Sequence, residues 1–354
     1  MNSNPNVLTN IFGYDERDVE FESIVNNLEA CDIEHGIEVI FDYYRRNGFP
    51  HYTIREDEKH DHMRKLKKFD IDTIFIDNQI IQTMHALRMA WTYFPHFWEV
   101  RCGNAKRTPM ETFLNDDKFK SVIRKCWNWC LRHEDGDKSI FHENRLRQSL
   151  KIYTGTQAVS NFRPTAAKLI YEKFGGDTIW DMSCGWGGRL IGFLASSRKR
   201  YIGTEPSSLT FEGLQKIKKD FFYLKKSVEL HKLGSEEFIP DRNSLDLCFT
   251  SPPYFDTEKY ADEETQSYIK FPTKEEWVNG FLRKTIENCY RGLKSGKHML
   301  INIANTPKYK FIEEETQKIA KELGFVQNDT LQLTLSSVMG AGYKYEPIFV
   351  FKKN

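Results

Sequence analysis

The sequence has no long apolar stretch and no excess of one charge. No run in its 354 residues approaches the roughly 18 apolar residues of a membrane-spanning helix. The first 20 residues also lack the basic segment and apolar run of a secretory signal. A formal net charge of +1 excludes the uniformly basic surface of a histone-like protein. These absences predict a cytoplasmic protein that does not associate with a membrane.

Cysteine is scarce, and its number is odd. Seven cysteines scattered along the chain predict reduced, buried thiols rather than a disulfide framework. Cys126, Trp127 and Cys130 follow helical spacing, so we expect them to face a core. With His133 they form a Cys-x3-Cys-x2-His pattern, but no convincing second ligand pair accompanies it, and we expect no metal site.

The pattern of the chain changes near residue 150. Residues 1–150 read as mainly helical, for example at 79–94 and 117–133, and form a possible target-recognition domain. In residues 151–354, short apolar runs alternate with helical patterns, which predicts an α/β domain with a largely parallel, Rossmann-like sheet. The predicted strands are 178–182, 200–204, 227–232, 245–250 and 298–303, with an antiparallel pair, 326–335 and 347–353, at one sheet edge.

Two helix ends can be read from single residues. Thr273 and Glu276 have the spacing of a capping box, which predicts a helix beginning after Thr273. Gly324 follows a helical pattern and is predicted to end it.

A glycine-rich turn follows the first predicted strand. Asp181 ends that strand, and Gly185, Gly187 and Gly188 precede an amphipathic helix. Glycines let a ligand approach the backbone, and open α/β sheets bind ligands beyond the carboxyl ends of their strands. The next strand ends at Glu205, whose carboxylate could accept both hydrogen bonds of a ribose diol. A dinucleotide fingerprint is disfavoured because Leu190 occupies the position of its third glycine.

A second turn, Ser251-Pro252-Pro253-Tyr254, follows the strand 245–250. Two prolines fix φ twice and remove two N–H donors, which leaves rigid carbonyls free to accept. The Ser251 hydroxyl and the Pro252 carbonyl could therefore hold the two hydrogens of a base amino group. Tyr254 offers a flat face on which the base could stack, and Phe255 could complete the pocket wall.

Together these segments resemble the DNA amino-methyltransferases, which modify cytosine N4 or adenine N6. The resemblance covers residues 150–354 and lies in DMSCGWGG, Glu205 and TSPPYF, with weaker matches at 161–174 and 342–353. It implies a class I S-adenosylmethionine (SAM)-dependent methyltransferase fold with SAM as cofactor. By the same resemblance the catalytic residues are Ser251, Pro252, Pro253 and Tyr254, and those contacting the cofactor are Phe162, Arg163, Asp181, Ser183, Cys184, Gly185, Gly187, Glu205, Pro206, Ser235 and Thr250.

One segment departs from that family. After the third strand the family often has an acid that reads the cofactor adenine, whereas this chain has HKLGSEEF. Ser235 or Glu236 is the expected substitute.

The resemblance also implies the substrate and the partners. The serine at position 251 favours cytosine N4 over adenine N6. DNA, double-stranded with a flipped base, is the expected partner, in a bacterial cell or a cell infected by a phage; a restriction endonuclease is a candidate second partner, and the oligomeric state stays open. Two alternatives remain: methylation of a base amino group in RNA, and a catalytically silent subunit that binds nucleic acid.

Recognition of the target is assigned to residues 1–150 and to the insertion 255–273. Glu258 and Tyr260 in the insertion lie near the expected base pocket, and the insertion reads either as a lid or as an acidic surface loop. The basic segments 64–70 and 101–109 are the candidates for phosphate contacts, or else are solvated faces.

Overall fold

The computed structural model describes residues 16–28, 32–132, 141, 143–338 and 342–354. The chain divides into two compact units: unit 1 combines Met1–Arg55 with Phe97–Val159, and unit 2 combines Glu56–His96 with Ser160–Asn354. A single boundary near residue 150 does not describe this division, because residues 56–96 pack with the sheet. Within the described part of the chain, every helix is too short or too polar to cross a membrane.

Unit 1 is helical, with an aromatic core. Gly36 permits a close approach between α2 and α6, since a Cβ atom there would lie 2.2 Å from the Trp127 ring. Cys126, Trp127 and Cys130 are buried, as their spacing predicts. The elements are α1 (Glu16–Asn26), α2 (Ile33–Asn47), α5 (Pro109–Leu114), α6 (Asp116–Arg132) and α7 (Glu143–Lys151), with the short strands β3 (Arg101–Cys102), β4 (Ile152–Tyr153) and β5 (Thr156–Gln157); the 3-10 helix η2 (Pro95–Glu99) spans the junction with unit 2.

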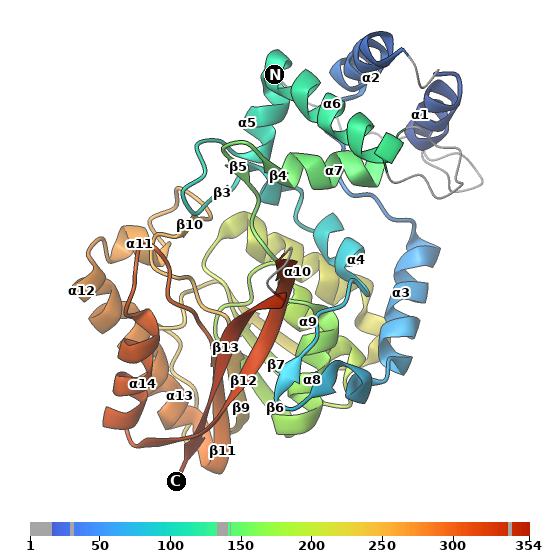
Figure 1. The fold of residues 1–354 in the computed structure, drawn as a ribbon. Helices are drawn as coiled ribbons and strands as arrows, with labels where there is room; N and C mark the ends of the chain where they lie inside the picture. The colour runs from blue at the N-terminus through green and yellow to red at the C-terminus, as the bar shows by residue number, and fades with distance from the viewer. Residues whose placement is uncertain (1–15, 29–31, 133–140, 142, 339–341) are drawn as a thin grey trace. The chain divides into compact units, whose positions relative to one another are not determined.

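Unit 2 is built on a twisted sheet with the strand order β1-β2-β12-β13-β11-β9-β6-β7-β8 (Figure 1). The five strands from β11 to the edge strand β8 are parallel, and β13 is antiparallel to both of its neighbours. This is the largely parallel, Rossmann-like sheet expected from the sequence. The strands are β1 (Phe75–Ile76), β2 (Gln79–Ile80), β6 (Thr178–Asp181), β7 (Arg200–Thr204), β8 (Ser227–His231), β9 (Leu245–Thr250), β11 (Leu293–Asn302), β12 (Phe325–Val338) and β13 (Gly342–Lys353), with β10 (Glu258–Lys259) outside this sheet.

The expected antiparallel pair, β12 and β13, is confirmed, but its place at the sheet edge is wrong. Residues Gln79–Ile80 form β2, which pairs in parallel with Gln332 and Leu333 of β12. The sequence placed these residues in a helical segment, 79–94, of which only Leu87–Thr92 is α-helix. Ile80 is fully buried in the sheet, so tertiary packing overrides the local pattern.

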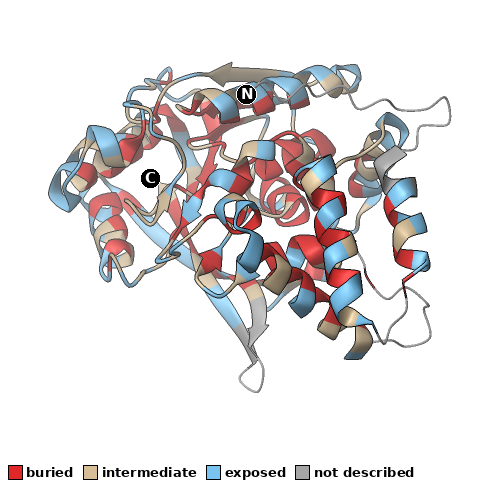
Figure 2. Ribbon diagram, turned by 90° about the horizontal axis from the view of Figure 1, so that it is seen from above, coloured by how far each residue is buried: buried red, intermediate tan, exposed pale blue. Residues whose placement is uncertain are grey.

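Helices cover both faces of this sheet (Figure 1). Phe249 of β9 contacts Tyr171 of α8, with ring centroids 5.9 Å apart, whereas the adjacent Cys248 belongs to the core formed with α13 and α14. Several helices in Figure 2 are buried along one side and exposed along the other, whereas all eight residues of α9 are buried. The helices of unit 2 are α3 (Glu56–Lys68), α4 (Leu87–Thr92), α8 (Pro164–Phe174), α9 (Gly188–Ala195), α10 (Ser208–Asp220), α11 (Ser267–Lys270), α12 (Lys274–Trp277), α13 (Arg283–Gly292) and α14 (Ile312–Glu322), with the 3-10 helices η1 (Ile71–Ile74) and η3 (Phe222–Leu224) and the π-helical turn η4 (Val278–Leu282).

Both predicted helix ends are confirmed. The capping box of Thr273 and Glu276 forms at the start of α12. Gly324 follows α14 with a φ of 97°.

Polar contacts fix residues 56–96 to the rest of unit 2. The Lys168 ammonium, on α8, donates to the backbone carbonyls of Leu66, Lys67 and Phe69 at 2.8 to 3.1 Å and so caps the end of α3. Asp220, at the end of α10, accepts hydrogen bonds from Lys59 and Tyr93. These contacts explain why the segment folds with the sheet.

Candidate active site

One side of the glycine turn between β6 and α9 faces open space, and its other side packs closely against the neighbouring backbone. Gly185 and Gly187 have φ values of 54° and 71°, in the left-handed region that favours glycine. A Cβ atom on Gly185 would meet nothing closer than 3.9 Å, whereas one on Gly188 would lie 1.9 Å from the Phe162 carbonyl oxygen. The turn therefore presents its backbone to open space at Gly185.

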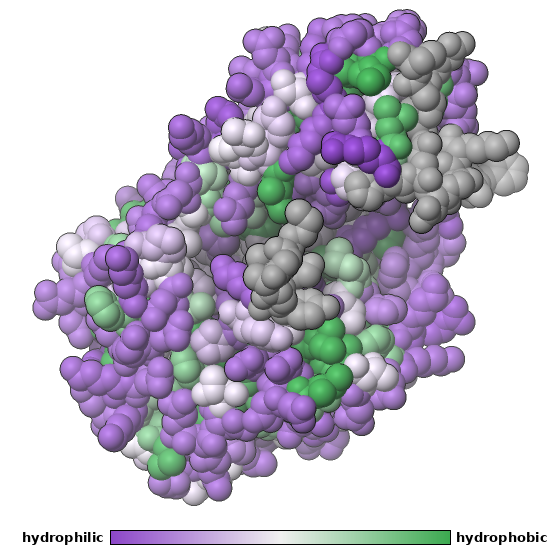
Figure 3. All heavy atoms as spheres, viewed as in Figure 1, coloured by the Kyte–Doolittle hydropathy of each residue, from purple (hydrophilic) through white to green (hydrophobic). Residues whose placement is uncertain are grey.

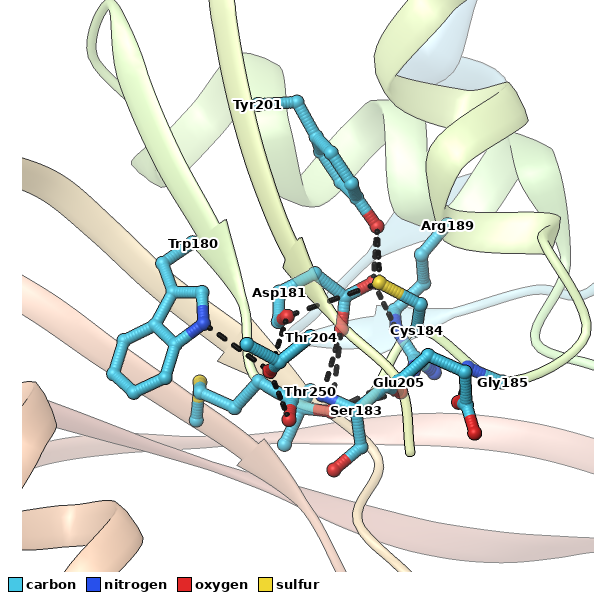
Figure 4. Close-up of polar contacts among 11 residues, drawn as sticks. Trp180, Asp181, Ser183, Cys184, Gly185, Arg189, Tyr201, Thr204, Glu205 and Thr250 are labelled. Carbon is cyan, nitrogen blue, oxygen red and sulfur yellow. Dashed lines mark hydrogen bonds and ion pairs between the residues drawn. The ribbon is translucent and has the colours of Figure 1, made fainter. Parts of the chain in front are cut away.

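Asp181 organises this turn through a buried network (Figure 4). Its carboxylate pairs with the Arg189 guanidinium at 2.9 Å and accepts a hydrogen bond from the Tyr201 hydroxyl at 2.7 Å. The Ser183 N–H and the Thr250 hydroxyl also donate to it, each at 3.3 Å. Because Asp181 is fully buried among these donors, its role here is to hold the turn, and a direct cofactor contact stays a prediction.

Sequence reasoning did not find Arg189 or Tyr201. The available signal for Arg189 was a single charged residue in the otherwise apolar helix GRLIGFLA. Arg189 also donates to the Ser183 carbonyl. Cys184 is buried beside Tyr201, whose hydroxyl oxygen lies 3.4 Å from Sγ, and burial raises the pKa of this thiol.

Glu205 lies next to the turn, at the end of β7. Its carboxylate accepts hydrogen bonds from the Gly185 N–H at 2.9 Å and the Ser207 N–H at 3.0 Å. Burial raises the pKa of Glu205 to about 7. The carboxylate and the glycine turn are thus hydrogen-bonded to each other beside the open space at Gly185, and a contact of either with SAM stays a prediction.

Two other predicted cofactor residues flank the turn. The Phe162 ring packs edge-on against Phe249, with centroids 5.3 Å apart. The Arg163 guanidinium donates to the Asn161 carbonyl at 3.4 Å, and the Asn161 side chain donates to the Trp186 carbonyl at 2.8 Å. The segment 161–163 therefore lies along the glycine turn.

The segment after β8 is tied to α13 and α11. The Ser235 hydroxyl is buried and bonds with Thr285 at 2.7 Å. Glu236 forms an ion pair with Lys270 at 2.9 Å. Both side chains have protein partners, and a role in reading adenine stays a prediction for either of them.

The Ser251-Pro252-Pro253-Tyr254 turn directly follows β9, the neighbour of β6. Pro252 is buried, whereas Ser251 and Tyr254 are half-buried. The Tyr254 hydroxyl donates to the Asn302 carbonyl at 3.3 Å, and burial raises the pKa of this phenol. The Thr250 bond to Asp181 joins this turn to the glycine turn.

Phe255 adopts a φ of 56°, which is uncommon for a residue other than glycine. Its ring packs edge-on against Trp277 and Tyr309, with centroids 6.1 and 6.4 Å away. The strained backbone therefore turns Phe255 into the core immediately after Tyr254.

The insertion after Phe255 is anchored to the glycine turn and the end of β7. Tyr260 hydrogen-bonds Glu258 and packs edge-on against Trp186, with centroids 5.9 Å apart. Glu263 accepts from the Ser208 N–H at 3.0 Å, at the start of α10, and Thr265 donates to the Pro206 carbonyl at 3.2 Å. These contacts favour an ordered strap over an unattached acidic loop. Sequence reasoning missed Trp186 and Glu263.

Some of the cations in the two basic segments already pair with carboxylates. In 64–70, Arg64 and Lys65 both pair with Asp61. In 101–109, Arg101 pairs with Glu111 at 2.9 Å. Phosphate contacts by either segment stay a prediction. Among the described residues, no group of three or more His, Cys, Asp or Glu side chains is placed to hold a metal ion.

Comparison with known proteins gives one family match and a set of similar solved structures. Residues 245–354, about a third of the chain, match the DNA methylase family. No curated protein sequence matches the chain. Solved structures similar to it include a TehB-like SAM-dependent methyltransferase from Corynebacterium glutamicum (TM-score 0.36, 15% identity, covering 55% of this chain and 90% of that one). The magnesium protoporphyrin IX methyltransferase from Synechocystis is also similar (TM-score 0.38, 13% identity, covering 53% and 76%).

These structural likenesses are too low to carry an argument about function. The family match includes β9, the Ser251–Tyr254 turn and the strands that close the sheet. Residues 245–354 are therefore similar to DNA methylases, and this match includes the Ser251–Tyr254 turn but not the glycine turn.

Proposed function

We propose that the chain methylates the exocyclic N4 of cytosine in DNA. The observation that carries this proposal is the junction of the two turns. The neighbouring strands β6 and β9 pair at Ile179–Leu247 and Trp180–Cys248, and the Thr250 hydroxyl bonds to Asp181 just beyond them. The Ser251 turn and the glycine turn therefore emerge side by side from the carboxyl edge of one sheet.

The residues of the Ser251 turn act on the amino group. A base amino nitrogen is a weak nucleophile because its lone pair is delocalised into the ring. The Ser251 hydroxyl and the Pro252 carbonyl accept its two hydrogens, which favours a pyramidal nitrogen and orients the lone pair. When bound, S-adenosylmethionine would supply an electrophilic methyl group. The methyl carbon would pass from sulfur to the amino nitrogen, S-adenosylhomocysteine would be left, and the nitrogen would release one proton to solvent.

Alignment and electrostatics are then the main contributions of the protein. Tyr254 is held by its bond to Asn302 and offers its ring to an extruded base, since base–aromatic stacking contributes about 1 to 3 kcal/mol. The serine at position 251, at the head of the motif, supports cytosine as the target by resemblance to the amino-methyltransferase family. Glu205 and the glycine turn hold the cofactor, with Phe162 and Arg163 beside them.

The test is nucleoside mass spectrometry after incubation with isotope-labelled SAM. Duplex DNA and total RNA are compared in parallel, and we expect label in N4-methyldeoxycytidine. Ser251→Ala removes one acceptor and should lower kcat by roughly 100-fold, by analogy with the loss of one oxyanion-hole donor. Ser227→Ala, the same change at the exposed start of β8, serves as the matched control.

Each contrary outcome has a distinct meaning. Label in N6-methyladenine would overturn the choice of base, and label confined to RNA would overturn DNA as substrate. SAM binding without any methyl transfer would support the silent subunit instead.

A further inference from the structure

A cavity of about 660 Å³ opens in unit 2 between α12, η4 and α13 on one side and the start of α14 on the other. Residues 307–311, in the loop after β11, form part of its wall. The surface over α12 and α14 is largely hydrophilic in Figure 3. Five basic side chains line the cavity against two carboxylates: Lys274, Arg283, Lys308, Lys310 and Lys318 against Glu275 and Glu315.

Three of these cations already have carboxylate partners. Arg283 pairs with Glu322 at 2.6 Å, and Lys318 approaches the same carboxylate at 3.9 Å. Lys308 pairs with Asp256 at 3.4 Å.

The other two cations, Lys274 and Lys310, have no carboxylate within ion-pair distance among the residues that the structure describes. Both are exposed. The Lys274 ammonium lies 5.2 Å from the centroid of the Tyr309 ring, and Glu315 is occupied by the Tyr309 hydroxyl at 2.6 Å. The cavity thus offers two cations that are available to an anionic ligand.

The wall of the cavity is connected directly to the segment after Tyr254. The Lys308 ammonium donates to the Asp256 carbonyl at 3.0 Å, and the Thr257 and Thr306 hydroxyls lie 3.4 Å apart. Tyr309 packs against Phe255. The wall of the cavity therefore contacts residues 255–257, which directly follow the Ser251–Tyr254 turn.

We propose that this cavity binds the phosphodiester backbone of the target strand beside the extruded base. Lys274 and Lys310 contact phosphates, and the Phe311 ring, which is 65% exposed, stacks on a neighbouring base. Alternating cations and aromatic rings are the usual surface for a nucleic-acid strand whose bases are unstacked. This inference rests on the proposed function, because it assigns a path to the same substrate.

The test is the salt dependence of binding between the protein and a fluorescent DNA duplex, measured by anisotropy without turnover. Loss of two phosphate contacts in Lys274→Ala/Lys310→Ala should reduce the slope of log K against log salt by about 2. Affinity at low salt should fall at least tenfold. SAM affinity by calorimetry and Tm should stay at wild-type values, which separates a lost DNA contact from misfolding.

Lys219→Ala/Lys321→Ala is the matched control, since it removes two exposed charges that do not line the cavity. If DNA is methylated but both double variants bind it equally, the cavity proposal is overturned and the proposed function stands. A second outcome is that no DNA is methylated but the cavity variant alone loses duplex binding. In that case the proposed function fails, and the cavity stands as a DNA-binding site. Inorganic phosphate and unlabelled DNA, at matched phosphate concentration, are also compared as competitors of the fluorescent duplex. If they displace it equally well, the cavity is a site for small anions and the proposal is overturned.

Discussion

The pair of Asp181 and Arg189 shows how one buried charge depends on another. Both side chains are almost fully shielded from water. Breaking a buried pair leaves an uncompensated charge, so Arg189→Met should lower the free energy of unfolding by about 3 to 5 kcal/mol. Urea denaturation followed by circular dichroism measures this change.

Arg200→Met is the matched comparison for that experiment. Arg200 pairs with Glu229 at the same distance, 2.9 Å, but both side chains are more than 40% exposed. An exposed pair contributes about 0 to 1 kcal/mol. Equal losses in the two variants would mean that burial does not set the energy of the Asp181 pair.

Glu205 makes stability depend on pH. Its pKa is raised to about 7 in the folded protein, whereas the ordinary value is 4.5. The folded state therefore holds a proton that the unfolded state has released between these values, and the free energy of unfolding falls as pH rises through that window. Glu205→Gln cannot ionise, so relative to this variant the wild type should lose roughly 3 kcal/mol between pH 4.5 and pH 7. Denaturant titrations across that range test this, and parallel curves for the two proteins would contradict it.

At the scale of elements, the close approach of the 161–163 segment to α9 depends on Gly188. A Cβ atom there would clash with backbone, which cannot move aside as a side chain can. Gly188→Ala should push the segment away from the glycine turn and weaken SAM binding at least tenfold by calorimetry. Gly296→Ala is the control for an added methyl group without a clash, because its Cβ would meet nothing within 4 Å; its φ of 78° adds a backbone strain that Gly188 does not have. Similar SAM affinity in both variants would show that the clash is relieved without cost to the site.

The strap after Phe255 should loosen when Glu263 is removed. Its carboxylate caps the first turn of α10 through the Ser208 N–H and hydroxyl. In Glu263→Ala we expect faster hydrogen exchange across residues 256–266, measured by mass spectrometry. Glu264→Ala removes the adjacent exposed carboxylate and should leave exchange unchanged. Unchanged exchange in both variants would assign the order of the strap to its other contacts.

Local sequence patterns predict these elements unevenly. The central strands are found to within one residue at most ends, because buried parallel strands read as continuous apolar runs. β2 is missed because a two-residue strand has no periodicity, and its partner in β12 lies about 250 residues away. Arg189, Tyr201 and Glu263 are missed for a related reason: their roles come from contacts between elements, which spacing along the chain does not encode.

At the scale of the whole molecule, unit 2 depends on residues 56–96, which lie between the two segments of unit 1 in the sequence. Phe94 fills the space beside Gly187 and Gly213, where an added Cβ would lie 2.4 to 2.9 Å from its ring. A fragment of residues 151–354 would lack this ring and the carbonyls at the end of α3 that Lys168 binds, and it should bind the dye ANS and unfold without a cooperative transition. Co-expression with residues 56–96 should restore cooperative unfolding. A cooperative fragment without that addition would show that residues 56–96 are dispensable for the fold.

The interleaved chain has a consequence for how the protein is made. Three peptide connections, near residues 55, 96 and 159, join the two units. All of unit 1 is synthesised by residue 159, whereas residues 56–96 must wait for strands that extend from residue 178 to residue 353. We therefore expect the apolar side of this segment to lack its native partners, and to be open to chaperones or non-native contacts, until the last of these strands has emerged.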